Sequence, residues 1–447
     1  MNKKLNKKRK FQLIAIAGVT GAFAFLIILF FLLFHFILKE PLLSLMEKAQ
    51  NPEPSAEESV SEETTEPIQE ETLPEEEPWT EVDLSEEETE ETDPLTRQID
   101  ALLGTMTMDQ KIGQLFIVTP ESLTSVDSVT AAGDATKAAL AQYPVGGIVY
   151  FSDNIKEPSQ FQEMTENTMS YSKELTGLPI FLSVDEEGGS VTRIASNENF
   201  DVSKFDDMSV IGATGDSSKA YEVGATIGTY LSEYGINLDF APVADVLTNS
   251  ENTVIAKRSF GDDPKLVSTM AIQVAAGLQD NGVYACMKHF PGHGATSEDS
   301  HNGAAVTEKT WDEMLSAEIV PFQDGILQGL PFLMVSHISA PNVTGDDTPA
   351  SLSTVMITDK LRTELSYDGI VITDALNMNA ITDNYTSGEA AVKAIEAGAD
   401  LLLMPENLQE AYQSIREAVA DGTITVERID ESLSRILRVK LQMDAFS

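Results

Sequence analysis

The sequence predicts an α/β fold, a (β/α)8 TIM-like barrel preceded by a transmembrane helix and a disordered acidic linker. Eight short apolar runs recur from Leu95 onward, with amphipathic, helix-like stretches between them. Strands that alternate with helices pair in parallel, and runs too apolar to alternate are buried on both faces of a sheet. A doubly wound open sheet is the alternative, but neither a Gly-x-Gly-x-x-Gly turn nor a Walker sequence follows any run. The closed barrel is therefore the leading architecture.

The start of the chain is predicted to form a cytoplasmic basic tail, residues 1–10, and a transmembrane anchor, residues 11–38. Six of residues 3–10 are basic, and residues 13–38 are almost wholly apolar. At ~1.5 Å per residue, that run is long enough to cross a hydrocarbon core of ~30 Å. A basic flank stays in the cytoplasm, so we expect a single-pass protein of the cell membrane whose C-terminal bulk is extracellular.

A cleaved signal peptide is the alternative interpretation of this apolar run. The run exceeds the usual core of a signal peptide, and no small-residue cleavage site stands out after it. A lipoprotein is excluded, because the only cysteine is Cys286. A single cysteine also leaves an external protein without an internal disulfide framework, so the fold depends on its hydrophobic core.

Residues 39–94 are predicted to be the disordered acidic linker. Residues 51–94 alone hold 19 acidic residues and six prolines but no Lys or Arg, which is the composition of a self-repelling spacer. The net charge of −43 divides into +6 for residues 1–50, −19 for residues 51–94 and −30 for the rest. A domain with so much negative charge is a poor binder of nucleic acid.

Residues 95–447 are predicted to form the barrel, with one strand in each apolar run. The eight runs are Gln114 to Val118, Gly147 to Phe151, Ile180 to Asp185, Asn237 to Asp245, Tyr284 to His289, Phe332 to His337, Gly369 to Asp374 and Asp400 to Met404. The helix-like segments between them include Glu157 to Leu175, Ser217 to Tyr234, Pro264 to Gly282 and Ser387 to Ala397. About 350 residues are ample to bury a core of this kind.

Ionisable residues end five of these runs, at the positions where a barrel of this type carries its active site. In this fold the site lies at the carboxyl ends of the strands. The strand ends carry Asp185, Asp245, Lys288, His289, His337 and Asp374. Equivalent placement of so many ionisable groups favours catalysis, although it does not by itself identify the reaction.

The segment after the fifth run concentrates groups that transfer protons. Lys288-His289-Phe290-Pro291-Gly292-His293-Gly294 leads into Asp299-Ser300-His301, so three of the five histidines lie within fourteen residues. Alternate side chains of an extended backbone point the same way, so the Asp299 carboxylate is expected to hold the His301 imidazole by a hydrogen bond. A base oriented by a carboxylate is half of a catalytic constellation.

Each of these residues also has a structural interpretation. Asp374 is the kind of residue that caps a helix. Asp185 fits a solvated acidic turn, although the Gly pair that follows also lets backbone approach a ligand. Arg258 and Lys288 fit surface charges, but Lys288 ends an apolar run, where burial requires a partner. His337 fits a core histidine.

A divalent metal site is an alternative use of the histidine-rich segment. Imidazole and carboxylate groups are common metal ligands. The candidates would be His289, His293, Asp299 and His301. Their spacing matches no compact metal motif such as His-Glu-x-x-His. We therefore expect a site that needs neither a metal nor an organic cofactor.

Five motifs make the chain resemble a known enzyme family. They are Asp-Glu-Glu-Gly-Gly at 185–189, Lys-Arg-Ser-Phe-Gly at 257–261, Lys-His-Phe-Pro-Gly-His-Gly at 288–294, Asp-Ser-His at 299–301 and Thr-Asp-Ala-Leu-x-Met at 373–378. From about Thr107 to the C-terminus, the chain resembles the bacterial β-N-acetylhexosaminidases of glycoside hydrolase family 3.

The resemblance implies a retaining exo-β-N-acetylglucosaminidase that releases terminal N-acetylhexosamine from glycans, including peptidoglycan fragments. It implies that Asp374 is the nucleophile, His301 the general acid/base and Asp299 its orienting partner. The sugar-binding positions implied in the same way are Asp185, Arg193, Arg258, Lys288 and His289. An imidazole would replace the acid of the usual pair of glycosidase carboxylates. Its reference pKa near ~6.5 suits both proton transfers.

One residue departs from the family pattern, and three alternative functions remain open. Ser190 follows the Gly pair where the family commonly has Arg, which bears on substrate preference. The second domain of many family β-glucosidases is expected to be missing, and the protein is expected to be a monomer. The alternatives are a β-glucosidase or β-xylosidase of the same family, a phosphorylase using the same residues, and a non-catalytic glycan-binding protein of the cell wall.

Overall fold

The computed structural model describes residues 93–296 and 305–443. The predicted basic tail and transmembrane anchor lie outside the described residues, as does the predicted linker except for its last two residues. Asp299 and His301 lie outside them too. Within the two described stretches, no helix is long and apolar enough to cross a bilayer.

Eight parallel strands form one sheet in the order β10-β1-β2-β3-β4-β5-β7-β9. Their bounds are β1 Phe116–Val118, β2 Gly147–Val149, β3 Phe181–Val184, β4 Leu238–Asp239, β5 Tyr284–Phe290, β7 Phe332–Val335, β9 Ile370–Thr373 and β10 Leu402–Leu403. The two edge strands meet where Ile372 bridges Leu401 and the Thr373 amide donates to the Leu401 carbonyl at 3.0 Å. The predicted α/β barrel is thus confirmed as an almost closed parallel sheet, with one strand in each predicted run.

Strand β4 is much shorter than the apolar run predicted from Asn237 to Asp245. Pro242 interrupts the pairing, because proline has no amide hydrogen to donate to a neighbouring strand. Parallel pairing resumes at Val243, which bridges Lys288. Asp245 therefore still lies beside the end of β5.

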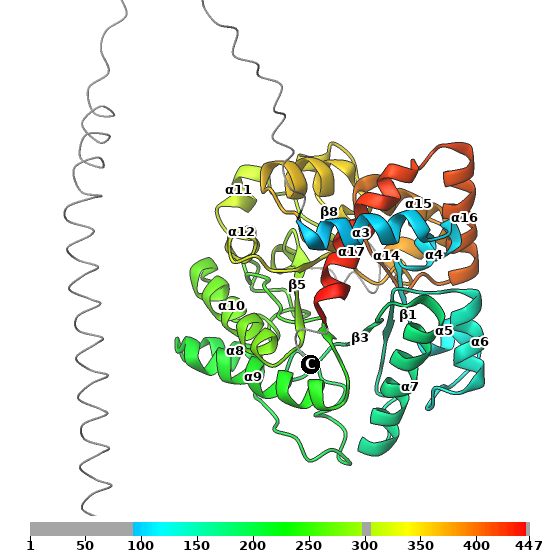
Figure 1. Ribbon diagram of the computed structural model, residues 1–447. Helices are drawn as coiled ribbons and strands as arrows, with labels where there is room; N and C mark the ends of the chain where they lie inside the picture. The colour runs from blue at the N-terminus through cyan, green and yellow to red at the C-terminus, as the bar shows by residue number, and fades with distance from the viewer. Residues whose placement is uncertain (1–92, 297–304, 444–447) are drawn as a thin grey trace, which may run out of the picture. The chain divides into compact units, whose positions relative to one another are not determined.

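Helices surround the barrel, as Figure 1 shows. The longer ones are α3 Pro94–Thr105, α6 Asp134–Gln142, α7 Pro158–Thr176, α9 Ser217–Glu233, α10 Pro264–Asp280, α12 Val320–Leu327, η4 Val355–Glu364, α15 Ser387–Ala397, α16 Leu408–Asp421 and α17 Val426–Gln442. Shorter elements are α4 Met108–Gly113, α5 Pro120–Thr124, α8 Met208–Gly212, α11 Trp311–Leu315, α13 Pro341–Thr344, α14 Asn379–Thr382, η2 His293–Ala295, η3 Ala350–Leu352 and the pair β6 Ala305–Val306 and β8 Ile338–Ser339. The four helices predicted above are all present, with ends within two residues of the prediction.

Side-chain caps explain where several of these helices begin and end. Asp216 and Asp263 each accept an amide of the first turn, at the starts of α9 and α10. Thr386 and Glu389 form a reciprocal capping box at the start of α15. Gly177 ends α7 in the left-handed region, with φ of 75°. The side-chain caps accept amide hydrogens that have no partner within the helix, and the glycine allows the left-handed conformation with which the helix ends.

Aromatic side chains and one lysine fill the amino-terminal end of the barrel. Phe181 of β3 and Phe332 of β7 meet edge to face, with ring centroids 5.4 Å apart. Lys440 of α17 extends over the Phe181 ring at 4.9 Å. Its ammonium donates to the Gln114 side chain at 2.7 Å and to the Gly146 carbonyl at 2.8 Å, just before β1 and β2. Lys440 is buried and pairs with no carboxylate of the described chain, and its burial lowers its pKa to about 7.

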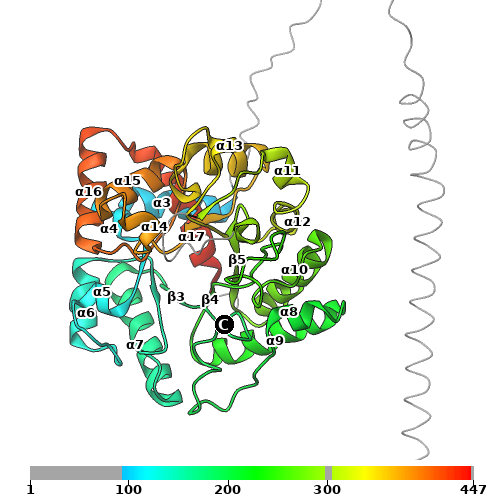
Figure 2. The same ribbon diagram turned by 180° about the vertical axis from the view of Figure 1, so that it is seen from behind.

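The two ends of the described chain lie together at this amino-terminal end of the barrel. Helix α3 lies beside α17 (Figures 1 and 2), and Ile99, Leu178 and Leu437 form a small cluster between them and the start of β3. The Arg438 guanidinium lies 3.9 Å from the Asp93 carboxylate. Residue 93 therefore lies at the face opposite the carboxyl ends of the strands.

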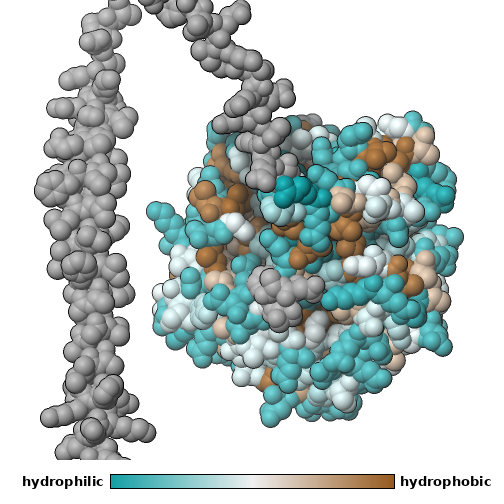
Figure 3. Space-filling model, viewed as in Figure 1, coloured by the Kyte–Doolittle hydropathy of each residue, from teal (hydrophilic) through white to brown (hydrophobic). Residues whose placement is uncertain are grey.

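The surface seen in Figure 3 is mostly hydrophilic, and hydrophobic side chains appear in separate spots. Among the described residues, the exposed large hydrophobic side chains are Val126, Val210, Tyr221, Leu327 and Val426. Each lies on a different helix or loop. Single exposed apolar side chains of this kind are common on protein surfaces.

Candidate active site

The turn after β3 presents two carboxylates at the carboxyl end of the barrel. Asp185 is partly exposed, whereas Glu186 and Glu187 are buried. Glu186 accepts the three backbone amides of residues 193–195 and the Tyr230 hydroxyl. Because Glu186 holds the turn from inside, Asp185 and Glu187 are free to make contacts across the mouth.

Lys288, near the end of β5, connects these two carboxylates. Its Nζ lies 2.7 Å from Asp185 Oδ1 and 2.7 Å from Glu187 Oε1. Arg258 donates to both oxygens of Glu187, from Nε at 2.8 Å and from Nη2 at 2.7 Å. Burial alone would raise the pKa of Glu187, but the charges of Lys288 and Arg258 outweigh it and hold that pKa well below its usual range. The partner that a buried Lys288 requires is present, so the surface-charge interpretation of Lys288 and Arg258 is wrong.

His289 lies between a carboxylate and a guanidinium. Its Nδ1 is 2.7 Å from Asp245 Oδ2, and its Nε2 is 3.3 Å from Arg258 Nη2. A ring that donates from Nδ1 and accepts at Nε2 satisfies both contacts. Asp245 also accepts the His293 amide at 2.6 Å. Although burial opposes it, contact with His289 and His293 lowers the pKa of Asp245, which therefore orients the ring as an anion.

Asp374 follows β9 and is partly exposed at the mouth. Its amide donates to the Val335 carbonyl at 2.8 Å, and its Oδ1 accepts the Ala375 amide at 2.8 Å. Burial alone would raise the pKa of Asp374, but His337, His289 and the Ala375 amide outweigh that effect and lower it. The side chain is therefore an ionised carboxylate, the form that a nucleophile requires.

The structure decides between two interpretations of Asp374 and His337. Helix α14 begins only at Asn379, so the helix-cap interpretation of Asp374 is wrong. His337 is a buried histidine whose Nδ1 is 2.7 Å from the Ser351 hydroxyl and whose Nε2 is 2.9 Å from the Ala375 carbonyl. His337 thus holds the backbone immediately after Asp374.

Arg193 joins the site from the loop after the Gly pair. Its Nη2 lies 3.3 Å from Asp185 Oδ2, and its guanidinium lies over the Phe151 ring at 5.2 Å from the centroid. Ser190 is exposed in the tight turn of residues 188–191. The departure from Arg at this position therefore places a short neutral side chain on the surface of the turn.

The structure brings most of the predicted site residues together. Those that meet at the mouth are Asp185, Arg193, Arg258, Lys288, His289 and Asp374. Asp299 and His301 lie outside the described residues, so their roles stay predictions. Sequence reasoning assigned no role to Glu187, although it pairs with both the buried Lys288 and the partly buried Arg258. Glu187 lies two residues after Asp185, and alternate side chains of an extended chain point to the same side. This spacing could have indicated that Glu187 also faces the site.

The metal alternative finds no support in the part of the chain that is described. There, no group of three or more His, Cys, Asp or Glu side chains is arranged to hold a metal ion. The His289 Nδ1 bonds instead to Asp245, and the His293 Nδ1 lies 3.0 Å from the Thr296 hydroxyl. That the full site needs no metal stays a prediction, because it also depends on residues 299–301.

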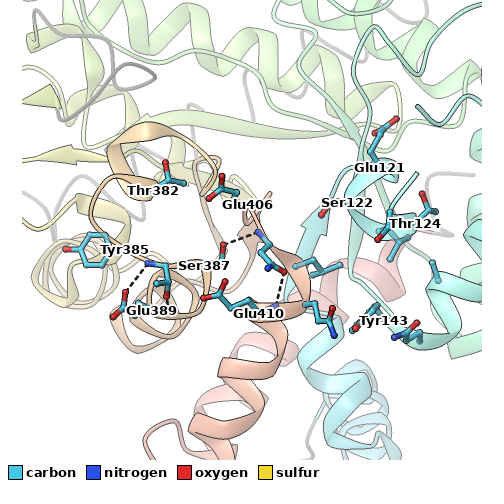
Figure 4. Close-up of a pocket in the computed structure, with 18 of the residues that line it drawn as sticks. Glu121, Ser122, Thr124, Tyr143, Thr382, Tyr385, Ser387, Glu389, Glu406 and Glu410 are labelled. Atoms are coloured by element: carbon cyan, nitrogen blue, oxygen red, sulfur yellow. Dashed lines mark hydrogen bonds between the residues drawn. The ribbon is translucent and has the colours of Figure 1, made fainter. Parts of the chain in front are cut away.

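A groove of about 1230 Å³ is lined by residues of α5 and α6, by residues 382–389 and by residues 406–410 at the start of α16 (Figure 4). Its labelled side chains include the carboxylates of Glu121, Glu389, Glu406 and Glu410 and the hydroxyls of Ser122, Thr124, Tyr143 and Tyr385. None of the predicted site residues lines it. The predicted site residues therefore do not belong to this groove.

Comparison with known proteins decides the family. The sequence model of the glycosyl hydrolase family 3 N-terminal domain matches residues 107–439. This chain belongs to glycosyl hydrolase family 3. The match includes every predicted site residue, from Asp185 to Asp374. The resemblance inferred from the five motifs is therefore confirmed.

Family 3 relatives of this chain carry hexosaminidase names. The chain is 34% identical over 351 residues to the beta-hexosaminidase LpqI of Mycobacterium tuberculosis, covering 74% of this chain and 82% of that protein. It is 31% identical over 329 residues to beta-hexosaminidase A of Pseudoalteromonas piscicida, covering 68% of this chain but 54% of that protein.

Solved family 3 structures share the fold. A beta-N-acetylglucosaminidase from Paenibacillus sp. str. FPU-7 matches with a TM-score of 0.72 at 38% identity, covering 76% of this chain and 64% of that one. The beta-glucoside phosphorylase BglX matches with a TM-score of 0.68 at 26% identity, covering 78% and 60% of the two chains. The chain is thus similar to proteins named for hydrolysis and to one named for phosphorolysis.

Proposed function

We propose that this family 3 protein is a retaining exo-β-N-acetylglucosaminidase, which removes terminal β-linked N-acetylhexosamine from glycans or peptidoglycan fragments. The names of its relatives support the sugar specificity. The observation that carries the proposal is Asp374, an ionised and partly exposed carboxylate beside Lys288 and His289 at the barrel mouth.

The reaction begins with attack of Asp374 on the anomeric carbon of the terminal sugar. The glycosidic bond breaks, and its electron pair goes to the leaving oxygen, which takes a proton from His301. Asp299 orients His301 during this transfer. Water then attacks the glycosyl ester and gives a proton to His301, and Asp374 departs as a carboxylate. Neither half of the reaction requires a metal or an organic cofactor.

The charged groups around Asp374 serve to hold the sugar. Asp185 keeps an exposed edge that can accept sugar hydroxyls, and Lys288 is fixed beside it at 2.7 Å. Because Lys288 and Arg258 are already paired with carboxylates, the mouth offers fixed donors and acceptors without an unpaired buried charge. Arg193 and His289 complete the proposed sugar-binding set.

Turnover of matched aryl glycosides tests the proposal. The full-length protein should cleave an aryl β-N-acetylglucosaminide much faster than an aryl β-glucoside or an aryl β-xyloside. Faster cleavage of the glucoside or xyloside would favour the corresponding alternative within the family. Binding of N-acetylglucosamine without turnover of any of the three would favour a non-catalytic glycan-binding protein.

Phosphorolysis is the second candidate function, because a beta-glucoside phosphorylase is among the structural relatives. The same assay, run with and without inorganic phosphate, separates the two. A hydrolase releases the free sugar at the same rate in both cases, whereas a phosphorylase releases a sugar 1-phosphate and needs phosphate.

We further propose that residues 11–38 anchor the protein in the cell membrane and that residues 39–94 are an acidic spacer to an extracellular catalytic domain. The length of the apolar run and the composition of the spacer support this arrangement. A monomer is supported by the scattered placement of the exposed hydrophobic side chains on the described domain. The net charge of −43 speaks against nucleic acid as a partner.

A further inference from the structure

Asp239 is a buried acid beneath the candidate site that the proposed mechanism does not use. It ends β4 and is fully buried. Parallel pairing places it between Val184 of β3 and Ala285 of β5. These two strands carry Asp185 and Lys288 at their ends, so Asp239 lies under the pair that is proposed to hold the sugar.

Only one carboxyl oxygen of Asp239 has a hydrogen-bond partner within the described residues. Oδ1 accepts the Glu186 amide at 2.9 Å. Oδ2 is buried without a partner. A buried carboxylate anion with an unbonded oxygen loses its hydration without compensation, and this costs far more than burying the neutral acid.

The carboxylates that face Asp239 also oppose its ionisation. The titratable groups around it are Asp185 and Glu186 of the β3 turn, Tyr230 of α9, and Cys286 and Lys288 of β5. The Lys288 ammonium is already shared between Asp185 and Glu187, each at 2.7 Å. Burial raises the pKa of Asp239 well above its usual range, and the charges of Glu186 and Asp185 add to the rise, against the opposing effects of the Glu186 amide and the Lys288 charge.

The hydrogen-bond partners assign the proton to Asp239 and not to the adjacent Glu186. Glu186 is equally buried, but it accepts the amides of residues 193–195 and the Tyr230 hydroxyl. Burial raises the pKa of Glu186 too, but four donors oppose that rise, whereas Asp239 receives only one donor. If only one carboxyl of this buried pair is ionised, it is therefore that of Glu186.

We propose that Asp239 is a positioning residue that stays protonated in the active protein. Its neutral carboxyl accepts the Glu186 amide and thereby fixes the turn that carries Asp185 and Glu187. Because it carries no charge, it does not draw Lys288 away from those two carboxylates. This inference rests on the proposed sugar-binding role of the turn.

Two substitutions in the full-length protein distinguish a neutral acid from an anion. Asp239→Asn keeps the shape, the acceptor oxygen and the absence of charge, so KM for the aryl β-N-acetylglucosaminide should stay within about threefold of wild type. Asp239→Leu leaves the buried Glu186 amide without an acceptor, so KM should rise about tenfold or more while kcat changes less. A loss of about tenfold or more in Asp239→Asn would mean that the charge is needed and would overturn the proposal.

Infrared spectroscopy tests the protonation without relying on turnover. The folded wild type at neutral pH should show the carbonyl band of a protonated carboxylic acid, and Asp239→Asn should lack it. Glu186→Gln is the matched control, because it removes the neighbouring buried carboxyl and should leave the band. A wild type without the band, or a band that persists in Asp239→Asn, contradicts the proposal. A protein that shows the band but cleaves no aryl sugar would contradict the proposed function alone.

Discussion

Buried charge at the barrel mouth is balanced residue by residue. Lys288 has two carboxylates at 2.7 Å, Arg258 binds one of them through two donors, and His289 is held by Asp245. Each side chain therefore has its orientation set before a sugar arrives. Such fixed dipoles and charges stabilise a transition state without first having to reorganise.

Asp374 is the residue on which turnover should depend most. Asp374→Asn should lower kcat by at least about 10³-fold, because an amide cannot form the glycosyl ester. A 2-fluoro sugar that traps the intermediate should label Asp374, which peptide mass spectrometry can verify. The exposed Asp383, just after α14, supplies the control, since Asp383→Asn should keep wild-type kcat. A label on a different carboxylate would refute the assignment.

The contribution of His301 to kcat/KM is expected to increase as the leaving group becomes poorer. His301→Ala should reduce kcat/KM strongly for leaving groups of high pKa and little for activated aryl groups, which depart without protonation. Asp299→Asn should show the same trend more weakly, because it disturbs the orientation of the imidazole without removing the proton carrier. The measurement is kcat/KM against leaving-group pKa for wild type and both variants. Equal losses across the series would exclude His301 as the acid.

The sequence predicts the positions of these residues better than their partners. Asp185, Lys288 and Asp374 were predictable, because each ends an apolar run and strand ends meet at one face of a barrel. The pairing of Arg258 with Glu187 was not, since the two lie 71 positions apart and the path between them depends on the packed fold. Partner choice is a property of the tertiary structure.

At the scale of elements, periodicity predicted all eight barrel strands but not their lengths. Strand β4 has only two residues, because Pro242 removes an amide from the ladder. The short pairing of β6 with β8 was not predicted at all. A two-residue bridge leaves no pattern in the sequence, because it forms only once longer elements bring its segments together.

Helix α17 carries the clearest pH-dependent element, Lys440. Burial lowers the folded-state pKa of Lys440 to about 7, below its ordinary 10.5. The unfolded chain therefore binds this proton more readily than the folded chain. As pH rises from about 7 toward 10, the free energy of unfolding should increase, by at most ~1.4 kcal/mol per pH unit. Below about pH 7 the penalty is complete and constant.

Chemical unfolding of wild type and Lys440→Met at several pH values between 7 and 9 tests this effect. The gain in stability with pH should be smaller in Lys440→Met than in wild type. Lys393→Met is the control, because Lys393 is exposed on α15 and its removal should leave the slope unchanged. Identical slopes in wild type and Lys440→Met would show that Lys440 keeps its ordinary pKa.

At the scale of the whole molecule, the domain is expected to function without its N-terminal part. Deleting residues 1–92 should give a protein that leaves the membrane fraction and keeps wild-type kcat/KM, because an acidic spacer cannot contribute to a core. Asp93 should be kept, since its side chain accepts two amides at the start of α3. A chain that begins at Leu95 should be less stable, because it lacks this cap. An insoluble or inactive protein beginning at Asp93 would mean that the spacer belongs to the fold.

Residue 93 lies beside α17, and this position has a practical consequence when the domain is attached to a solid support. A bead or resin attached through that end leaves the barrel mouth facing the bulk solution. Polymeric substrates too large to enter the gap between protein and support would then still reach Asp374. Attachment through the turn after β3 would face the mouth toward the support, and only short, freely diffusing fragments would be cleaved.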